Sequence, residues 1–371
     1  MKIITIVGAR PQFIKLQPLS KELRKKHEEI IIHTGQHYDF EMSKLFFDEL
    51  NIPKPDYNLE VGSGKPGYQL AQMLKKTEEI LMKEKPELVI IFGDTNSTLA
   101  GALSAIQNHI PSAHVEAGPR NKWLDVPEMI NRVIVDNICQ LLFCATESNL
   151  DNLRNEGLSH KAYFVGDITY DIFLENIKRM EQKENILEKY DIKPNEYHVA
   201  SCHRAENTDE KNRLKTIIEG MTASDEKIIF SLHPRTKKMM GKFNLYEIIE
   251  KSNNITPIDP IGYLDFIQLE YHANKIITDS GGVQREAYFL KKPCINIYDH
   301  TYWPEIRDDG WQVVTGINKE KIADDIRNFK PTKPQSGLFG DGITAKKIVE
   351  IINKTDFNNI FEYKKYSEKY G

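Results

Sequence analysis

Cysteine is scarce in this sequence, with four residues in 371. No two of them form a CxxC pair, and no histidines lie at the spacing of a zinc-ligand set. This pattern excludes a disulfide-stapled secreted domain and a structural zinc centre. We therefore expect reduced thiols and a cytoplasmic protein; the four residues are Cys139, Cys144, Cys202 and Cys294.

Long apolar runs and an excess of one charge are also missing. No window approaches the roughly 20 unbroken apolar residues of a membrane-spanning helix. The apolar start, Ile3–Val7, is soon interrupted by Arg10, so it is too short for a secretory leader and is predicted to be a strand. Lys and Arg number 50 against 54 Asp and Glu, a net charge of −4. We expect neither nucleic acid nor an anionic membrane as a partner, because no positive field would hold them.

What is present is an ordinary folded composition, with 40% hydrophobic and 28% charged residues. The length suits two domains of roughly 150 residues each, or slightly more. Short apolar runs alternate with helix-length segments in both halves, which is typical of βαβ units and of parallel sheets covered on both faces. The predicted strands are Ile3–Val7, Ile30–His33, Leu88–Phe92, Ala113–Val115, Leu141–Cys144, Tyr197–Ser201, Lys227–Ser231, Ile255–Pro257, Lys275–Thr278, Cys294–Ile297 and Val313–Val314.

We therefore predict an α/β protein with two Rossmann-like, doubly wound domains, residues 1–170 and 171–354. A tail, residues 355–371, is expected to form a helix that packs back on the first domain. The charged, glycine-free segment Asp171–Tyr190 is predicted to be a helix between the domains. Ligands of open α/β sheets bind at the carboxyl ends of the strands, so we expect the site in a cleft between the domains.

Three acidic residues in the first half have positions that suit a reactive site. Asp94 and Glu116 each follow a predicted strand, and Glu128 lies at a predicted helix start. Asp94 taken alone fits a helix N-cap equally well. Three carboxylates on one rim would repel one another, and the resulting pKa differences suit an acid and a base. His114, two residues before Glu116, leaves a metal site as the competing interpretation.

A phosphate group is the ligand that the cationic strand ends favour. The first strand runs into Gly8 and Arg10 and then into a helix that contains Lys15. The sequence there is neither GxGxxG nor a P-loop, so a nicotinamide or P-loop site is a weak interpretation. We predict that Arg10 contacts a phosphate, with a surface salt bridge as the alternative.

The second half carries a similar set of residues. His203 and His233 each follow a predicted strand and have an arginine close by in the sequence, which favours an anion site. Ser280-Gly281-Gly282 ends a strand and begins a helix, whose free N–H groups and dipole suit a diphosphate. The position of Glu286 suits a carboxylate that accepts hydrogen bonds from a ribose diol. It suits equally well a carboxylate that interacts with the dipole of its own helix.

These segments read, in order, VGARPQFIK, HTGQHYD, GDTNST, HVEAG, PE-x-INR, HRAEN, HPRT, DSGGVQREA and FGDG. With them the sequence resembles the non-hydrolysing UDP-N-acetylglucosamine 2-epimerases over nearly its whole length. The resemblance implies the glycosyltransferase-B architecture and a reversible inversion at C2 of the sugar without an external cofactor. In that family the C2 proton is removed and UDP is eliminated to give a bound 2-acetamidoglucal, and UDP then adds back after reprotonation from the other face.

The resemblance also implies roles for individual residues. The family's catalytic positions match Asp94, Glu116, Glu128 and His203. Contacts to the UDP-sugar are predicted for Arg10, Lys15, Arg132, His233, Phe266 (beside uracil), Ser280, Gly281, Gly282 and Glu286. A UDP-sugar is the expected partner and a homodimer the expected assembly.

Several positions depart from the family pattern. Asp39, Tyr68 and Met129 replace residues that help bind a second UDP-N-acetylglucosamine as an activator in regulated members. The loss of these polar partners predicts hyperbolic rates without such activation. Tyr302 and Trp303 stand where the family has charged residues, which leaves a modified sugar such as UDP-2,3-diacetamido-2,3-dideoxyglucuronate as an alternative substrate.

Three other functions stay open from the sequence. A hydrolysing 2-epimerase uses nearly the same residues, and a glycosyltransferase shares the same fold. A non-catalytic nucleotide-sugar sensor would need the cations but no proton shuttle, so the three acids and His203 disfavour it.

Overall fold

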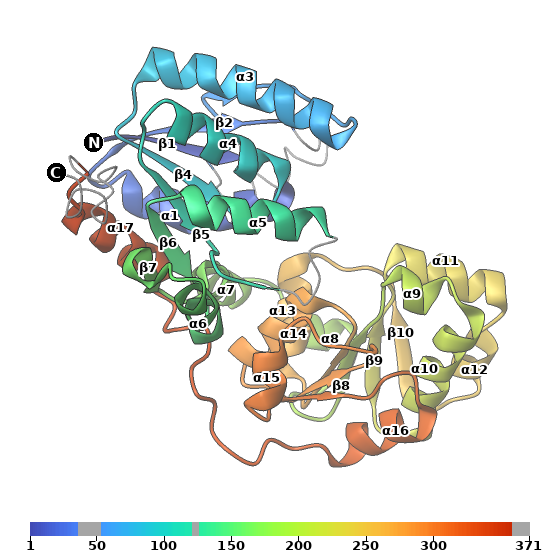
Figure 1. Ribbon diagram of the computed structural model, residues 1–371. Helices are drawn as coiled ribbons and strands as arrows, with labels where there is room; N and C mark the ends of the chain where they lie inside the picture. The colour runs from blue at the N-terminus through green and yellow to red at the C-terminus, as the bar shows by residue number, and fades with distance from the viewer. Residues whose placement is uncertain (36–52, 121–125, 358–371) are drawn as a thin grey trace. The chain divides into compact units, whose positions relative to one another are not determined.

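A computed structural model describes residues 1–35, 53–120 and 126–357, and the chain divides into two compact units (Figure 1). The first unit is formed by Met1–Ile172 together with the chain from Phe339, and the second by Phe173–Leu338. Each unit contains a parallel sheet with helices along it. The predicted α/β class with two doubly wound units is confirmed.

The sheet of the first unit has, within the described residues, seven strands in the order β3-β2-β1-β4-β5-β6-β7, all paired in parallel. The sheet is covered on both faces: in β4, Leu88, Ile90 and Phe92 pack in one apolar cluster, whereas Val89 and Ile91 pack in another. This explains why its strands read as unbroken apolar runs. The strands are β1 (Lys2–Val7), β2 (Glu28–His33), β3 (Tyr57–Asn58), β4 (Leu88–Phe92), β5 (Ser112–Val115), β6 (Leu141–Cys144) and β7 (Ala162–Phe164).

The helices of the first unit follow its strands in sequence. Pro11 lies in the first turn of α1, where its missing N–H group leaves no intrahelical bond unmade. The bounds are α1 (Arg10–Leu23), α3 (Pro66–Glu84), α4 (Asn96–Gln107), α5 (Pro127–Ile138), α6 (Glu147–Asn155), α7 (Ile168–Met180), which continues into the second unit, and α17 (Thr344–Lys354).

The helix α17 corrects the predicted domain boundary. We expected the second domain to run to residue 354, but the second unit ends at Leu338 and α17 belongs to the first. Its apolar side, which includes Ile348 and Ile352, packs in the core of the first unit. Asp171 accepts hydrogen bonds from the N–H groups of the first two residues of α17, which fixes where the returning chain begins its helix. The periodicity of a helix does not reveal which domain its apolar side covers.

The sheet of the second unit has six parallel strands in the described chain, in the order β10-β9-β8-β11-β12-β13. Its strands are β8 (His198–Ser201), β9 (Ile228–Ser231), β10 (Ile255–Ile258), β11 (Ile276–Thr278), β12 (Cys294–Asn296) and β13 (Gln312–Val314). Its helices are α8 (Ile186–Lys189), α9 (Ala205–Thr208), α10 (Lys211–Ala223), α11 (Pro234–Phe243), α12 (Tyr246–Glu250), α13 (Tyr263–His272), α14 (Gly281–Phe289), α15 (Pro304–Asp308) and α16 (Lys319–Asn328).

Other expectations differ from the structure in detail. The single helix predicted over Asp171–Tyr190 is two helices, because α7 ends at Met180 and α8 begins at Ile186. The strands β3 and β7 were not predicted, since they are short edge strands with partly exposed residues. The predicted helical tail from residue 358 onward lies outside the described residues.

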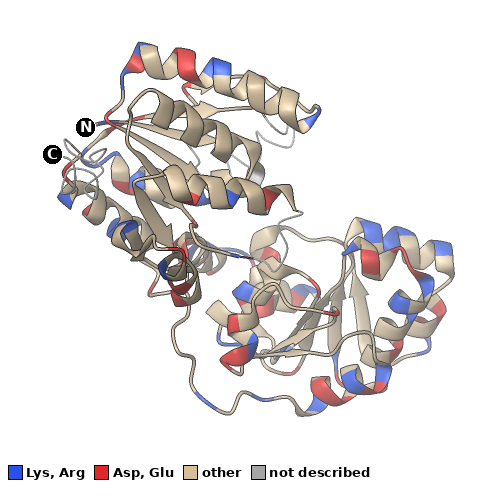
Figure 2. Cartoon of the chain, viewed as in Figure 1, with Lys and Arg blue, Asp and Glu red and all other residues tan. Residues whose placement is uncertain are grey.

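Lys, Arg, Asp and Glu residues are concentrated on helices and loops, whereas the strands of both sheets are almost free of them (Figure 2). All four cysteines are buried and none forms a disulfide. No helix within the described ranges is long and apolar enough to cross a membrane.

Candidate active site

The strand order reverses once in each sheet, and four of the predicted site residues follow the strands at these two points: Arg10, Asp94, His203 and Ser280. In the first unit the reversal lies between β1 and β4, and in the second between β8 and β11. At such a point the connections that follow the two parallel strands lead away in opposite directions, and the crevice between them is where open α/β sheets bind ligands. The loops to consider are therefore Gly8–Ala9 and Gly93–Thr95 in the first unit, and Cys202–Arg204 and Asp279–Ser280 in the second.

In the first unit the side chain of Gln12 joins the two loops. Its amide oxygen accepts hydrogen bonds from the N–H groups of Gly8, at 2.8 Å, and Ala9, at 3.0 Å. Its amide nitrogen donates to the carbonyl of Phe92 at 2.6 Å and to the hydroxyls of the Gly93 loop and α4. The backbone donors after β1 are thus already used, which distinguishes this loop from a phosphate-binding P-loop.

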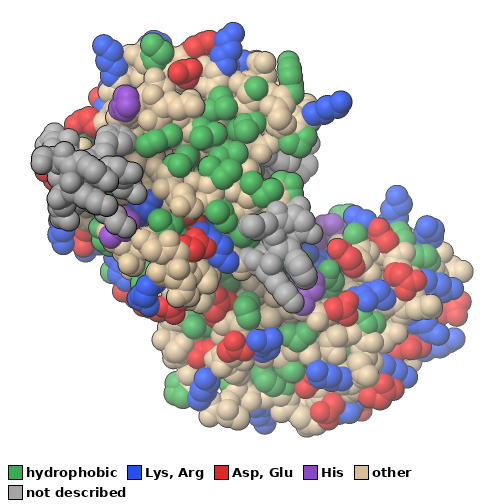
Figure 3. All heavy atoms as spheres, viewed as in Figure 1, with side chains coloured by type: hydrophobic (Ala, Val, Ile, Leu, Met, Phe, Trp, Pro, Cys, Tyr) green, Lys and Arg blue, Asp and Glu red, His purple; other side chains and the backbone are tan. Residues whose placement is uncertain are grey.

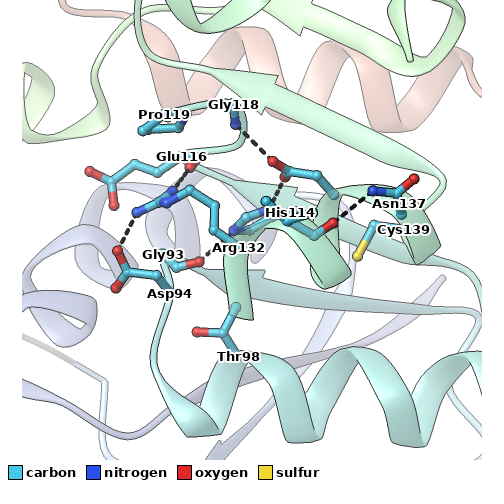
Figure 4. A network of polar contacts seen from close by, with 12 residues as sticks. Gly93, Asp94, Thr98, His114, Glu116, Gly118, Pro119, Arg132, Asn137 and Cys139 are labelled. Carbon is cyan, nitrogen blue, oxygen red and sulfur yellow. Dashed lines mark hydrogen bonds and ion pairs between the residues drawn. The ribbon is translucent and has the colours of Figure 1, made fainter. Parts of the chain in front are cut away.

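Asp94 is held by α5 (Figure 4). A guanidinium nitrogen of Arg132 donates to the Asp94 carboxylate at 2.5 Å, and the Asn131 amide donates to the Asp94 carbonyl at 2.9 Å. The other terminal nitrogen of Arg132 donates to the carbonyl of Glu116. One mostly buried cation therefore connects two of the predicted catalytic acids.

Glu116 has its own cation and an unusual backbone. Its carboxylate forms an ion pair with Lys15 of α1, and both side chains are largely buried. Its φ angle is +69°, in the left-handed region that non-glycine residues seldom adopt. Such conformations cost roughly 1–3 kcal/mol and are found most often at functional sites. The predicted crowding of unpaired acids is therefore replaced by two acids, each paired with a cation.

Two predicted residues of this unit are not brought into the cluster. Glu128 is exposed in the first turn of α5 and has no hydrogen bond or ion pair in the part of the chain that the structure describes. Arg10 begins α1, but its side chain lies outside the described parts. Asp39 also lies outside them, whereas Tyr68 is 67% exposed and Met129 is buried.

His114 does not face the acids as a metal ligand would. Its ring contacts the Asp136 carboxylate at 2.7 Å and the Gly93 carbonyl at 2.6 Å. Residues two apart in a strand would share a face, but β5 ends at Val115 and the left-handed backbone of Glu116 turns out of the strand. Within residues 1–35, 53–120 and 126–357, no group of three His, Cys, Asp or Glu side chains could hold a metal ion.

In the second unit a buried carboxylate, Asp279, organises the loop after β8. It accepts hydrogen bonds from the N–H groups of His203 and Arg204, both at 3.0 Å, and from the Asn207 amide at 3.0 Å. The Cys202 thiol also lies 3.3 Å from it. This residue begins the DSGG segment, so the motif after β11 fixes the shape of the motif after β8.

His203 and His233 lie next to each other. Their ring centres are 5.2 Å apart, and His203 Nδ1 is 3.6 Å from the Asp279 carboxylate. Burial and the neighbouring His203 lower the pKa of His233, which favours its neutral form. Because His233 Nδ1 accepts the N–H of Arg235 at 3.2 Å, its Nε2 is the nitrogen left to donate to a ligand.

The side chain of Arg204 lies against an aromatic loop. Its Nε donates to the carbonyl of Asp279 at 2.7 Å and one terminal nitrogen donates to the Tyr302 hydroxyl at 2.7 Å. The guanidinium carbon is 4.1 Å from the centre of the Tyr302 ring and 5.1 Å from that of Tyr298. Trp303 donates to the carbonyl of Gly281 at 2.9 Å. The aromatic residues that depart from the family pattern thus stand next to the predicted anion site.

The anion site itself has the predicted form. Ser280 is the N-cap of α14, and its hydroxyl accepts the N–H of Val283 at 3.5 Å. The N–H groups of Gly281 and Gly282, at the positive end of the helix dipole, have no hydrogen-bond partner in the described chain. Arg235, the arginine close to His233 in the sequence, pairs with Asp209 at 2.9 Å beside a cavity of about 550 Å³ on α11.

Glu286 lies within α14 and faces α13. The Tyr263 hydroxyl donates to its carboxylate at 2.7 Å. Burial raises the pKa of Glu286, partly offset by Tyr263 and Arg285. Phe266 lies on the same helix as Tyr263 and is partly buried in the adjoining apolar cluster.

A second carboxyl group, Glu270, lies close enough to interact with Glu286. It is fully buried, and neither of its oxygens has a hydrogen-bond partner among the described residues. Burial, followed by the nearby Glu286, raises the pKa of Glu270 well above its ordinary value. Sequence reasoning had given Glu270 no role.

Comparison with known proteins adds the family relationship. A family model described as UDP-N-acetylglucosamine 2-epimerase matches residues 21–353. The chain is 54% identical over 354 residues to a UDP-N-acetylglucosamine 2-epimerase homolog of Methanococcus maripaludis, covering 95% of this chain and 99% of that protein. It is 40% identical over 364 residues to the UDP-2,3-diacetamido-2,3-dideoxy-D-glucuronate 2-epimerase of Pseudomonas aeruginosa, covering 95% of this chain and 100% of that protein.

A solved structure is similar over the whole fold. The Methanocaldococcus jannaschii UDP-GlcNAc 2-epimerase, in complex with UDP-GlcNAc and UDP, matches with a TM-score of 0.77 and 44% identity. The match covers 96% of this chain and 100% of that one. The similarity therefore includes both units and both strand-order reversals.

Proposed function

The chain belongs to the non-hydrolysing UDP-N-acetylglucosamine 2-epimerase family of isomerases, and we propose that it interconverts UDP-N-acetylglucosamine and UDP-N-acetylmannosamine. The observation that carries the proposal is the connection made by Arg132 between Asp94 and Glu116. An inversion at carbon needs one group to remove a proton and another to return it from the opposite face. Arg132 holds the Asp94 carboxylate and the backbone carbonyl of Glu116, so that it keeps the two acidic residues together for this division of work.

The reaction that we propose is an elimination followed by an addition. A carboxylate of the first unit takes the C2 proton, the C2–H electron pair forms the C1–C2 double bond, and the C1–O bond breaks to release UDP. The bound product is a 2-acetamidoglucal. A proton then reaches C2 from the other face, and the diphosphate oxygen adds back to C1, so that atoms and charges balance. Asp94, Glu116 and Glu128 are the proposed proton carriers.

The second unit would hold the leaving group. The amides of Gly281 and Gly282 and the α14 dipole favour a diphosphate. His203, oriented by Asp279, and His233, with a donor nitrogen available, are suited to the charge that develops as the C1–O bond breaks. We further assign the remaining UDP-sugar contacts to Arg10, Lys15, Phe266, Ser280 and Glu286.

A second substrate is favoured by one observation. Arg204 stacks on Tyr302, one of the two aromatic residues that stand where the family has charged residues. The similar Pseudomonas aeruginosa protein is named for a 2,3-diacetamido glucuronate. UDP-2,3-diacetamido-2,3-dideoxyglucuronate is therefore the alternative substrate.

The experiment that tests the proposal is product analysis with both nucleotide sugars offered separately. We expect UDP-N-acetylglucosamine to be converted to its 2-epimer with no accumulation of free UDP, and with Glu116→Gln as the inactive control. Conversion of the glucuronate alone would shift the assignment to the alternative. Stoichiometric release of UDP and free sugar would show a hydrolysing enzyme, and an unchanged substrate pair would contradict an epimerase.

We also propose a homodimer in which α5 contributes to the interface. Val126, Ile130 and Ile134 recur at every fourth position from the N-cap of α5 and are 40%, 46% and 37% exposed. In Figure 3, hydrophobic side chains gather on the face of the first unit over α4 and α5. Apolar side chains that recur on one exposed helix face are typical of protein contacts.

A further inference from the structure

A buried polar pair lies behind the acids of the first unit. His114 of β5 and Asp136 of α5 are both fully buried, with His114 Nδ1 2.7 Å from an oxygen of Asp136. The other ring nitrogen, Nε2, is 2.6 Å from the carbonyl oxygen of Gly93. The second oxygen of Asp136 accepts the N–H of Gly118 at 3.1 Å. Figure 4 shows this network around His114, Gly93 and Gly118.

The two glycines at the ends of this network adjoin the acids. Gly93 directly precedes Asp94, and Gly118 lies two residues after Glu116. Gly93, Glu116 and Gly118 all have left-handed backbones, with φ angles of +65°, +69° and +92°. A Cβ at Gly118 would lie 2.4 Å from the carbonyl oxygen of Asn149, so this turn is also confined sterically. Glycine adopts this region readily, whereas glutamate does not, so the backbone of Glu116 is the part that needs support.

Both hydrogen bonds of the His114 ring can form together only if both ring nitrogens carry hydrogen. The carbonyl of Gly93 is an acceptor only, and so is an ionised Asp136. Arg120 also donates to Asp136, at 2.8 Å, which favours the ionised carboxylate. Although burial acts to raise the pKa of Asp136, the contacts with His114 and Arg120 bring it below its ordinary value. The geometry thus corresponds to an imidazolium between a carboxylate and a carbonyl.

We propose that His114, acting as an imidazolium paired with Asp136, is a positioning residue that fixes the backbones next to Asp94 and Glu116. It does not touch the substrate. Its ring links the turn that precedes Asp94 to the turn that follows Glu116, so that the two carboxylates keep a constant separation during turnover. The proposal rests on the proposed function, since it assigns meaning to the placement of these two acids.

Two substitutions at His114 each remove one of its two hydrogen bonds and keep the other. In His114→Gln, the amide nitrogen can take the place of Nε2 and donate to Gly93, while the bond to Asp136 is lost. In His114→Asn, the amide nitrogen can take the place of Nδ1 and donate to Asp136, while the bond to Gly93 is lost. We expect kcat to fall at least tenfold in each variant, with KM for the UDP-sugar and Kd for UDP within about threefold of the wild type.

A matched control uses another buried carboxylate of the same unit. Glu29 of β2 accepts hydrogen bonds from Thr5, at 2.8 Å, and Arg24, at 2.8 Å, and it lies at the opposite ends of the strands from the acids. Glu29→Gln should lower the melting temperature comparably and leave kcat within about twofold. If Glu29→Gln lost kcat in proportion to stability, or if folded His114 variants kept kcat within threefold, the positioning role would be overturned.

A measurement on the wild type requires neither activity nor a variant that folds. In protein labelled with ¹⁵N-histidine, proton–nitrogen correlation at neutral pH should show a slowly exchanging ring with hydrogen on both nitrogens. Detection of only neutral rings among the slowly exchanging histidines would overturn the proposal. Because this readout needs no substrate, it also distinguishes failure of the positioning role from failure of the proposed epimerase function, which would leave the wild type inactive.

Discussion

The buried carboxylate of Asp279 accepts a hydrogen bond from the backbone N–H of His203 at 3.0 Å. These residues follow β11 and β8, the two strands at which the order of the second sheet reverses. The same carboxylate accepts the N–H of Arg204 and the amide of Asn207. The loop that presents His203 is therefore shaped by the motif that begins the anion site, and both should be lost together.

Replacing Asp279 by asparagine tests this dependence. Asparagine offers one acceptor oxygen where the carboxylate offers two. Its NH₂ group would face N–H groups that now donate hydrogen bonds to Asp279. We expect the second unit to lose about 3 kcal/mol of stability, measured as a lower urea midpoint, and turnover to fall at least tenfold. The control is Asp265→Asn, which removes a partly exposed ion pair with Lys183 and should cost less than about 1 kcal/mol. Equal midpoints for the two variants would contradict the role given to Asp279.

Binding and turnover should respond to different residues. We expect Arg10→Ala and Glu286→Ala to weaken UDP binding roughly ten- to a hundredfold, because a charge-assisted contact contributes about 1.5–3 kcal/mol. Asp94→Asn and Glu116→Gln should reduce kcat instead and leave UDP affinity within about threefold. Titration calorimetry with UDP and initial-rate measurements separate the two effects. Unchanged UDP affinity in the first pair of variants would remove those residues from the anion site.

The buried carboxyl of Glu270 predicts a pH dependence of stability. Its pKa in the folded protein lies well above the ordinary 4.5, so its protonated form favours folding. That contribution is complete below about pH 4.5 and is lost as the pH rises through the folded-state pKa. Glu270→Gln, which cannot ionise, should therefore gain stability relative to the wild type as the pH is raised from 5 to 8. The control is Glu250→Gln, at an exposed position, whose melting temperature should follow that of the wild type at every pH. If the melting temperatures of Glu270→Gln and the wild type also changed equally with pH, this interpretation would be contradicted.

The proposed homodimer depends on the exposed apolar side of α5. A charge at Ile130 would have to be buried without a partner in the interface, which is costly. Ile130→Asp should shift the mass measured by light scattering from two chains to one at micromolar concentration. Tyr271→Asp, at a site of similar exposure on the second unit, should leave the mass unchanged. A monomeric wild type would be inconsistent with the proposed assembly.

Much of the fold was predictable because the strands are buried on both faces. An apolar run such as Leu88–Phe92 needs no partner to be recognised, and the acid or glycine that follows it marks the strand end. The return of α17 to the first unit was not predictable, because its apolar stripe would suit either core. Short edge strands such as β3 contain no apolar run in the sequence, so no pattern predicts them.

The candidate site was predictable in its reacting groups but not in what holds them. Asp94 and Glu116 are visible as acids after strands, whereas their pairing through Arg132 requires the packing of α5. Gln12 and Asp279 act over distances of about 80 residues in sequence, and no local pattern reports such a bond. The left-handed backbone of Glu116 likewise depends on the turn that follows β5.

The central claim, proton transfer at C2 by elimination and re-addition of UDP, is tested most directly in D₂O. UDP-N-acetylglucosamine should be incubated with the enzyme without any added nicotinamide cofactor, and the products followed by proton NMR. The account predicts UDP-N-acetylmannosamine with deuterium at C2, followed by deuterium at C2 of the recovered substrate. Formation of the epimer with protium retained at C2 would contradict it.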